Sequence, residues 1–514
     1  MEQLSKPSDP ETGPPEPDGE SIPSTVVLVI GLLLAAAFVM ILNETVMGVA
    51  LPRLMEDLEI SAATGQWLTT AFMLTMAVVI PTTGLILKRF TTRAVFMTSM
   101  SLFTAGTALA AAAPGFPVLL VARIVQAAGT AVMLPLLITT VLTFVPATRR
   151  GSTMGLISIV IAVAPAIGPT FSGLILSELS WRWIFLFVLP VAVVALVVGS
   201  MRITNITTPA EARFDLVSIA LSAVAFGGLV YGLSSIGESA EGDTPLPPAV
   251  PIAVGFVALA LFTFRQLSLQ RGGERQPLLD LRPFRNRSFT VGLIMLLVSM
   301  GALFGTLILL PIFLQNVRDL STLETGLVLL PGGLVMGLVA PLAGRMYDRV
   351  GPRPLVVPGA FVVAGALASM QLLETDSPVG LAIAVHVVLS VGLGLLMTPL
   401  MTSSLGSLPA ELYSHGSAIL NTLQQLAGAA GTALFITVMT RGATSEVESG
   451  VDPLTAQASG IHDAFLCGAV LALVATGLSF LIRRPPTPVA APEAGGAAGS
   501  GSDSDDEAVP APLH

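Results

Sequence analysis

Two charged side chains stand in otherwise apolar stretches, where a charge is costly. Glu44 lies in the segment 41–52, and Arg123 lies in the segment 119–129. Charged residues at bilayer depth are rare and usually functional, because a charge there must be paired or neutralised. A carboxyl group can take up and release a proton, and a nearby guanidinium influences that exchange. We therefore interpret Glu44 and Arg123 as a proton-coupling pair. The alternative is a static buried ion pair that only orders the helices.

The composition indicates which elements position these two residues. Of the 514 residues, 53% are hydrophobic and 11% are charged, whereas soluble domains carry about 25% charged residues. Apolar runs long enough to span a bilayer as helices recur along the whole chain. These runs are continuous rather than short and alternating, which excludes a membrane β-barrel. The predicted fold class is an all-α polytopic membrane protein. Its single cysteine, Cys467, excludes an intrachain disulfide.

The apolar runs predict fourteen transmembrane helices. Their approximate ranges are 26–51, 64–87, 94–113, 117–138, 153–177, 183–201, 215–235, 249–268, 288–314, 323–343, 354–373, 379–402, 415–440 and 463–482. Because fourteen is even, both ends of the chain lie on one side. Lys and Arg concentrate in alternate loops, beginning with 88–93 and most densely at 265–287. The positive-inside rule then places both termini in the cytoplasm.

The spans group into two bundles with an insertion between them. We predict six-helix bundles at 26–202 and 288–484, two extra helices at 203–270 and a polar cytoplasmic loop at 271–287. Residues 1–25 and 485–514 are acidic and poor in groups that could form a core, so we predict disordered cytoplasmic tails.

The two charged residues are predicted to share one depth. A rise of ~1.5 Å per residue puts Arg123 about 9 Å below the outer surface when span four starts near Pro117. The same arithmetic puts Glu44 about 10 Å below it when span one ends near Leu51. The shared depth allows direct or water-mediated contact between them. The second bundle has no equivalent deep acid, which suggests one main titrating site.

The predicted inner loop between spans ten and eleven carries a Gly- and Arg-rich motif. Its glycines allow close helix approach, and its acid and arginines could lock and release an inner gate. The alternative is a solvated turn with a weak charge pair. The segment resembles the loop motif of the major facilitator superfamily, with matches at Gly344, Asp348, Arg349, Gly351 and Arg353.

Other segments extend this resemblance. Gly168, Pro169 and Gly173 resemble the antiporter motif of span five, although small residues at this spacing also serve ordinary helix packing. The segment 119–129 is similar to the span-four motif with its central arginine, here Arg123. The stretches 41–45, 71–83 and 90–93 look like the lincomycin-efflux-type subgroup of the fourteen-span drug:proton antiporters.

Two motifs depart from the family pattern. In the N-terminal copy of the loop motif, Lys88 replaces the expected Asp and Thr91 replaces the expected Gly. The N-terminal half therefore lacks the Asp on which such a gate lock depends. In span one the acid is Glu44, one position after Asn43 where the family usually has Asp. One position corresponds to about 100° around a helix.

The resemblance implies proton-coupled efflux of a small amphipathic drug-like substrate by alternating access, with no cofactor other than the proton motive force. It also implies a monomer in the bacterial plasma membrane, with no metal and no nucleic-acid partner. Candidate residues for the substrate pocket are polar or adaptable side chains in the spans. These are Asn43, Gln66, Trp67, Met73, Gln315, Asn421 and Gln424.

Other functions remain as alternatives. The chain could export an endogenous metabolite or lipid, with drug efflux incidental. A non-transporting membrane receptor would need a sensory domain, and the sequence has no long structured loop to form one. The sequence shows no nucleophile-and-base pair and no Walker A motif, so neither an enzyme nor an ATP-driven pump is indicated. His386, inside span twelve, could join a proton path but is more simply a packing residue.

Overall fold

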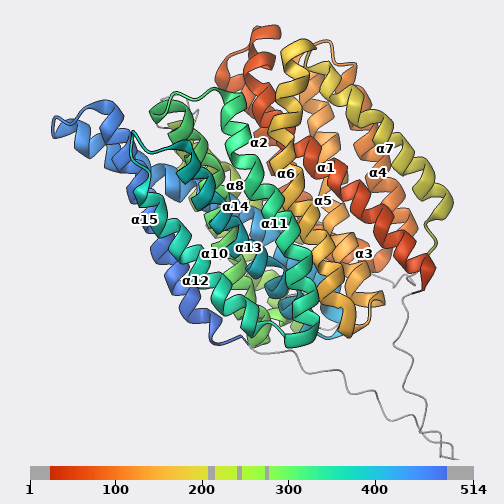
Figure 1. Cartoon of the computed structure of the whole chain (residues 1–514). Helices are drawn as coiled ribbons and strands as arrows, with labels where there is room; N and C mark the ends of the chain where they lie inside the picture. The colour runs from red at the N-terminus through yellow and green to blue at the C-terminus, as the bar shows by residue number, and fades with distance from the viewer. Residues whose placement is uncertain (1–22, 206–214, 240–245, 273–276, 483–514) are drawn as a thin grey trace, which may run out of the picture.

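The computed structural model describes residues 23–205, 215–239, 246–272 and 277–482 (Figure 1). Within these ranges fourteen helices are long and apolar enough to cross a membrane, which confirms the predicted number. The ranges also contain no β-strand. The predicted tails at 1–22 and 483–514 lie outside the described residues, as do 206–214, 240–245 and 273–276.

The first half of the chain forms six spans. Its helices are α1 (Ser24–Asp57), α2 (Ala62–Val79), α3 (Thr83–Arg89), α4 (Thr92–Ala111), α5 (Phe116–Phe144), α6 (Arg150–Glu178) and α7 (Arg182–Arg202). The 3₁₀ turn η1 (Ile80–Thr82) joins α2 to α3, so these three elements make one span. Pro81 lies in this turn and lacks the backbone N–H that a continuous α-helix would use.

The remaining eight spans follow the same pattern. The helices are α8 (Leu216–Ser239), α9 (Ala249–Gly272), α10 (Arg287–Ile312), α11 (Thr322–Val350), α12 (Arg353–Ser369), α13 (Val379–Gly406), α14 (Tyr413–Glu448) and α15 (Pro453–Ser479). A π-helical turn, η4 (Phe313–Val317), continues α10. Helices α1 and α14 run beyond the predicted spans because polar turns extend them. On α1, for example, Arg53 pairs with Glu56 and Asp57.

The helices pack as two bundles that meet along two seams. Helix α1 contacts α6, and α4 contacts α5 and α7, whereas α10 to α15 contact one another. At the first seam α6 lies along α11. At the second seam α8, which pairs with α9, packs against both α2 and α14. A side chain at Gly333 or Gly337 of α11 would collide with Ala166 or Val163 of α6, so these glycines allow the first seam to close.

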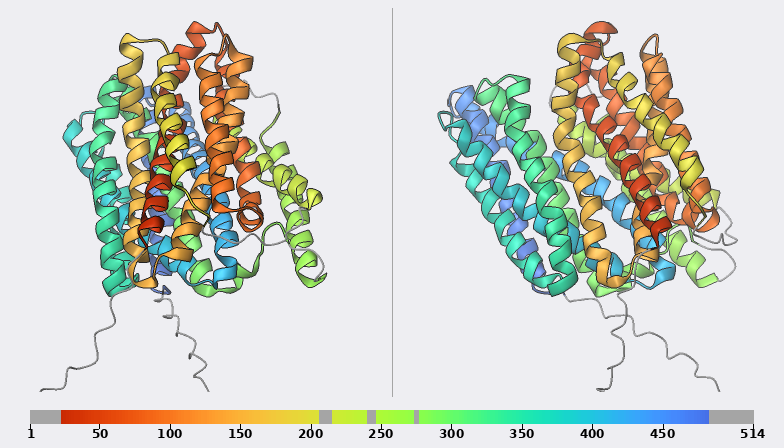
Figure 2. Two further views of the ribbon diagram at one scale, coloured as in Figure 1. Left: turned by 90° about the vertical axis from the view of Figure 1, so that its right-hand side faces the viewer. Right: turned by 45° about the vertical axis from the view of Figure 1, so that its right-hand side comes forward.

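The two ends of the assembly differ in how closely the bundles approach. We call the end at which residues 23 and 482 lie the terminal face, and the other end the opposite face. Figure 2 shows the two groups of helices close together near the terminal face and diverging toward the opposite face. The predicted site residues are distributed along this axis.

Candidate functional site

A cavity of about 530 Å³ lies between the two bundles. Helices α1, α2, α8, α10 and α14 contribute its walls. The lining residues are Glu44, Gln66, Thr69, Thr70, Met73, Val230, Ser234, Phe304, Ile308, Ile312, Gln425, Gly428, Ala429, Thr432, Ile436, Met439 and Thr440. On α2 they lie near the start, and on α8 and α10 near the end, so the cavity lies toward the opposite face. Most of its wall is apolar, and a few hydroxyl and amide groups are placed on it.

Glu44 is the one charged residue among those that line the cavity. Its helix α1 is held next to the predicted antiporter motif of α6. Gly168 packs on Thr45 so closely that a Cβ would lie 2.3 Å from the Thr45 hydroxyl, and the Ser172 hydroxyl donates to the Val46 carbonyl at 3.2 Å. The small residues of α6 therefore position the turn of α1 that carries Glu44. Gly173 has no atom within 4 Å of such a Cβ.

Arg123 is buried behind this wall, inside the N-terminal bundle. It is 1% exposed. Its Nε donates to the Leu68 carbonyl at 3.4 Å, and an Nη donates to Gln126 Oε1 at 3.1 Å. The guanidinium also lies 4.1 Å from the centre of the Phe72 ring, a favourable cation–π arrangement. Gln126 is fixed in turn by donating to Thr107 at 2.9 Å.

Glu44 and Arg123 interact electrostatically, but at a distance. Each charge acts on the other. Among the described residues no ion pair joins them within 4.0 Å. In this conformation Arg123 is therefore bound to α2 and Gln126, and Glu44 is left facing the cavity.

The one-residue displacement of the acid decides which side chain reaches the cavity. Asn43, at the position where the family usually has Asp, is fully buried. Neither its amide nitrogen nor its amide oxygen has a hydrogen-bond partner among the described residues. Adjacent helix residues point in directions about 100° apart. Glu44 consequently lines the cavity, and Asn43 does not.

The structure brings some of the other predicted pocket residues together. Gln66 and Met73 line the cavity. Trp67 stacks on Tyr231 of α8 with ring centres 5.9 Å apart. Asn421 is buried and donates to the Ser417 carbonyl at 2.8 Å. Gln315 lies in η4 and is not among the lining residues.

Sequence reasoning did not anticipate the part played by α8. Val230 and Ser234 of this helix line the cavity. Ser61 caps α2 by accepting from Thr64 at 3.2 Å, which sets the start of the helix that faces α8. Small and hydroxyl residues recur along α8. This pattern alone does not tell whether the extra helix lies in the seam between the bundles or outside it.

At the terminal face Asp348 closes the first seam. This residue of α11 accepts from the backbone N–H groups of Gly151 at 2.7 Å and Ser152 at 2.8 Å. Those groups begin α6, where N–H groups lack partners within the helix and favour a negative charge. A Cβ on Gly344 would lie 2.1 Å from the Gly151 carbonyl, so this contact requires glycine.

The rest of the motif shapes the turn after α11. Gly351 ends the helix with φ of 82°, a backbone conformation that favours glycine. Arg349 and Arg353 are exposed at the terminal face, and Arg353 begins α12.

The second seam closes with different chemistry. A Cβ on Gly84 of α3 would lie 2.8 Å from His415 Nδ1 at the start of α14. Lys88, in place of the family Asp, interacts electrostatically with Asp280 in the loop after α9. The Asp280 N–H donates to His415 Nδ1 at 3.4 Å. Burial favours the neutral form of Asp280, but hydrogen bonds from Arg282 outweigh it and hold the pKa of Asp280 below its ordinary value.

Two further polar contacts join the bundles on this side. An Nη of Arg150 donates to the Tyr413 hydroxyl at 3.0 Å, and the Thr398 hydroxyl donates to Ser158 at 2.7 Å. The terminal side is therefore closed by contacts from α3, α6, α11, α13 and α14. The cavity lies farther from the terminal face, in the half of the molecule where the two bundles diverge.

His386 is buried between α13 and α11. A Cβ on Gly332 would collide with the His386 ring. Its Nδ1 has no partner among the described residues. The residue does not line the cavity, which places it away from Glu44.

Comparisons with known proteins agree with this architecture. The family model described as Major Facilitator Superfamily matches residues 33–432. The lincomycin resistance protein LmrB of Listeria monocytogenes is 43% identical over 461 residues, which cover 89% of this chain and 96% of that protein. An uncharacterized MFS-type transporter of Bacillus subtilis, YcnB, is 41% identical over 91% of this chain and 98% of its own length.

More distant relatives share the fold. The multidrug resistance protein B homolog of Mycobacterium tuberculosis is 31% identical, covering 80% of this chain and 75% of that protein. The crystal structure of the human organic anion transporter MFSD10 (TETRAN) superposes with a TM-score of 0.62 at 15% identity, over 88% of this chain and 99% of that one.

The chain belongs to the major facilitator superfamily. It is a multi-pass membrane protein with fourteen apolar helices, and its family is one of transporters rather than enzymes.

Proposed function

We propose that this protein is a proton-coupled exporter of amphipathic drug-like compounds that works by alternating access. The observation that carries the proposal is the position of Glu44. A single carboxyl group lies in the wall of a cavity between the two bundles, and that cavity is separated from the terminal face by closed contacts. A proton carrier in such a place meets one side of the membrane at a time.

The terminal face is assigned to the cytoplasm. The loops at this face contain most of the basic residues, including Lys88, Arg89, Arg93, Arg149, Arg285, Arg345 and Arg353. Positively charged loops stay on the cytoplasmic side during insertion. The described conformation is then outward-facing, with Glu44 reachable from outside the cell.

In the proposed transport cycle, a proton and the substrate compete for Glu44. In the outward-facing state a proton neutralises the carboxylate and weakens its hold on a substrate that bonds to it, so the substrate leaves. The bundles then rock about the seams, the contacts of Asp348 and Arg150 separate, and Glu44 meets the cytoplasm. There the proton leaves, favoured by the positive field of Arg123, and a new substrate binds.

The energy of one proton is sufficient for efflux. At 100 mV one charge is worth ~2.3 kcal/mol, which sustains a gradient of about 50-fold for a neutral substrate. The cavity volume of about 530 Å³ is within the range of drug-binding sites. The relative in Listeria monocytogenes is named a lincomycin resistance protein, so lincomycin is the first compound to test.

Purified protein in proteoliposomes provides the test. With the wild type, lincomycin added to one side should drive proton movement across the membrane. Glu44→Gln should abolish this movement, since an amide cannot carry the proton, and should leave lincomycin binding measurable. Glu448→Gln, which changes an exposed acid at the end of α14, serves as the matched control and should behave as wild type. Proton movement by Glu44→Gln at the wild-type rate would refute the role of Glu44.

A further inference from the structure

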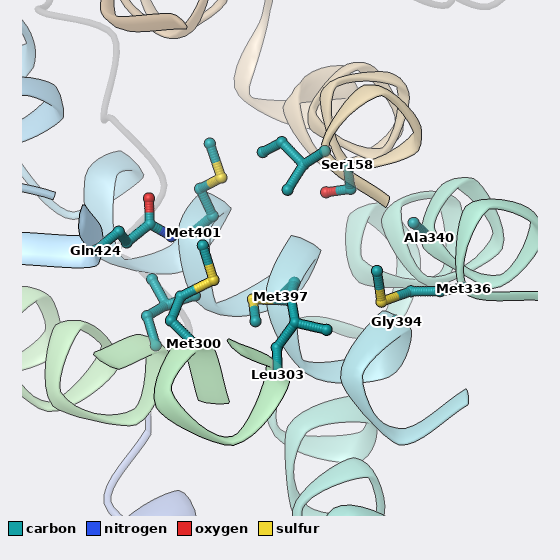
Figure 3. Close-up of a pocket in the computed structure, with 11 residues that line it drawn as sticks. Ser158, Met300, Leu303, Met336, Ala340, Gly394, Met397, Met401 and Gln424 are labelled. Carbon is teal, nitrogen blue, oxygen red and sulfur yellow. The ribbon is translucent and has the colours of Figure 1, made fainter. Parts of the chain in front are cut away.

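A second pocket lies between the cavity and the terminal face, and its wall is rich in methionine. Met300 of α10, Met336 of α11, and Met397 and Met401 of α13 contribute their side chains (Figure 3). Ile161, Leu296, Leu303, Ala340 and Gly394 complete the apolar wall. The enclosed space is about 20 Å³, roughly the room that one water molecule needs.

This methionine pocket adjoins the large cavity through two helices. Met300 precedes Phe304, a lining residue of the cavity, by four residues on α10, which is about 6 Å along the axis. On α14, Gln424 lines the methionine pocket and the next residue, Gln425, lines the cavity. The two spaces therefore follow one another along the same seam.

One polar group faces the methionine pocket without a partner. Gln424 is 7% exposed, and Figure 3 shows its amide beside the Met401 side chain. None of the hydrogen bonds formed among the described residues involves this amide. A buried amide normally has hydrogen-bond partners, because leaving it without one costs free energy. The group is thus available to a ligand.

The pocket also lies at the joint that must open during transport. Ser158 and Ile161 of α6 form the part of its wall that belongs to the N-terminal bundle. The hydrogen bond from Thr398 to Ser158 closes this joint. When the bundles separate at the terminal face, the methionine pocket gains an opening toward that face.

The chemistry of the wall selects the ligand group. Methionine has three rotatable bonds and a polarizable sulfur, so it adapts to varied apolar shapes and contacts aromatic rings favourably. No ionisable side chain lines the pocket. A charged group would be poorly accommodated there, whereas an alkyl chain or ring that carries a hydroxyl, carbonyl or amide would satisfy both the sulfurs and Gln424.

We propose that the methionine pocket is a second substrate subsite, which receives the neutral apolar end of the substrate when the bundles are open toward the terminal face. Gln424 supplies the hydrogen bond that orients that end. This proposal rests on the proposed function, because it requires an amphipathic substrate and an inward-open state. It adds that entry from the cytoplasmic side is selected by the apolar group of the substrate, in a pocket that adjoins the cavity lined by Glu44.

Site-directed labelling separates this subsite from the main cavity. In a chain with Cys467→Ser, Met397→Cys places one thiol in the methionine pocket and Met439→Cys places one in the large cavity. A membrane-impermeant maleimide is applied to inside-out vesicles, so that it enters from the terminal face. Met397→Cys should react, and lincomycin at ten times its Kd should slow the reaction about tenfold, since only empty sites react.

The pattern of protection distinguishes the outcomes. If lincomycin protects Met439→Cys but leaves the labelling of Met397→Cys unchanged, the subsite is refuted and the proposed function stands. If it protects neither thiol, both proposals fail for this substrate. Unreactive Met397→Cys from the terminal face would also refute the subsite. Lincomycin transport by the single-cysteine chains checks that they fold.

The amide provides an independent readout. Gln424→Met keeps the size of the side chain and removes its hydrogen bond. The KM for lincomycin should rise about 2- to 10-fold, the usual effect of one neutral hydrogen bond, with kcat preserved. Met201→Leu, at an exposed site outside both pockets, keeps an apolar side chain of similar volume, so it is the control and should retain the wild-type KM. An unchanged KM in Gln424→Met would overturn the orienting role of the amide.

Discussion

Arg123 is held by the N-terminal bundle and not by the acid whose charge it feels. Its donors are used on Leu68 and Gln126, and its plane lies on Phe72. A guanidinium fixed in this way provides a constant positive field at the cavity wall. Glu44 is the member of the pair whose surroundings change when the cavity fills or empties.

Arg123→Lys tests whether that fixed field matters. Lysine keeps the charge, but it lacks the planar fork that bonds to two acceptors while stacking on a ring. We expect the ammonium to move off its position and lincomycin-driven proton movement to fall strongly. Unfolding in detergent should shift by only a few degrees. Arg202→Lys, at an exposed site, is the control. Normal coupling by Arg123→Lys would mean that only the charge is needed.

The sequence predicted these two residues because a charge in an apolar run is conspicuous. It could not predict that Gln126 and Thr107 complete the anchoring of Arg123, because uncharged polar residues are common in spans. In the sequence, the three-residue spacing between Arg123 and Gln126 is the one feature that indicates a contact between these two side chains. Asn43, Gln315 and Asn421 were grouped with the pocket on polarity alone, and polarity does not say toward which neighbour a helix face is turned.

At the scale of helices, two unlike sets of contacts close the bundles together at the terminal face. At the α6–α11 seam a carboxylate binds the free N–H groups at a helix start. At the seam of α3 and α14 the equivalent position is Lys88, and the acid comes instead from the loop that follows α9. The loop thereby ties the inserted helix pair to the gate.

Asp348→Asn should weaken the first closure. An asparagine amide has one acceptor oxygen and no charge, so one of the two bonds to the start of α6 is lost. Loss of a charge-assisted hydrogen bond should shift the equilibrium toward the open gate by roughly 10- to 100-fold. Labelling of Ser158→Cys from the terminal side measures this opening. Asp376→Asn, an acid in an opposite-face loop, should leave the rate unchanged.

The inserted pair α8–α9 is fastened by a bidentate ion pair. Arg265 donates to Asp215 at 2.7 and 2.9 Å, and these bonds, together with those from Ser218, lower the pKa of Asp215 from 3.8 to about 2. A lowered carboxyl pKa stabilises the folded pair above pH ~4, and the stabilisation is lost as the pH falls toward 2.

Hydrogen exchange of α8 checks this pH dependence. Between pH 7 and 4.5, after correction for the intrinsic exchange rate, protection of the first turn of α8 should stay constant in the wild type. Asp215→Asn should lower that protection throughout the range, because the amide cannot replace the ion pair. A protection loss in the wild type near pH 6 would show that another group controls the pairing.

The number and approximate positions of the helices were predictable, since hydrophobic length alone specifies a span. The position of α8 was not. Its apolar residues cover the whole circumference, so no stripe in the sequence tells which face meets α2, α14 or lipid. Helix ends such as Asp57 and Glu448 were also missed, because the polar turns that extend α1 and α14 lie beyond the apolar runs.

At the scale of the whole molecule, the inserted helices complete the enclosure of the cavity. Helices α6 and α11 close one side between the bundles, and α8 covers the other side between α2 and α14. The stacked rings of Trp67 and Tyr231 join α8 to α2 beside the cavity. The cavity is thereby shielded from the lipid along this seam.

Tyr231→Ala should open that shield. An aromatic pair contributes ~0.5–1.5 kcal/mol, so the separated form of the seam should become about 2- to 10-fold more populated. A thiol at Ser234→Cys should then react faster with a lipid-soluble maleimide, while its reaction with a water-soluble one from the opposite face stays the same. Phe256→Ala, on an exposed part of α9, is the control. Equal lipid-side reactivity in both variants would exclude this role of the stack.

The Trp67–Tyr231 pair provides an intrinsic fluorescence probe of this seam. Only three tryptophans occur in the chain. Trp181 is fully buried, and Trp183 is 42% exposed. Trp67 alone joins the edge of the cavity to the inserted helices. A chain with Trp181→Phe and Trp183→Phe would emit from a single indole, whose colour and quenching follow the rocking of the two bundles without any attached dye.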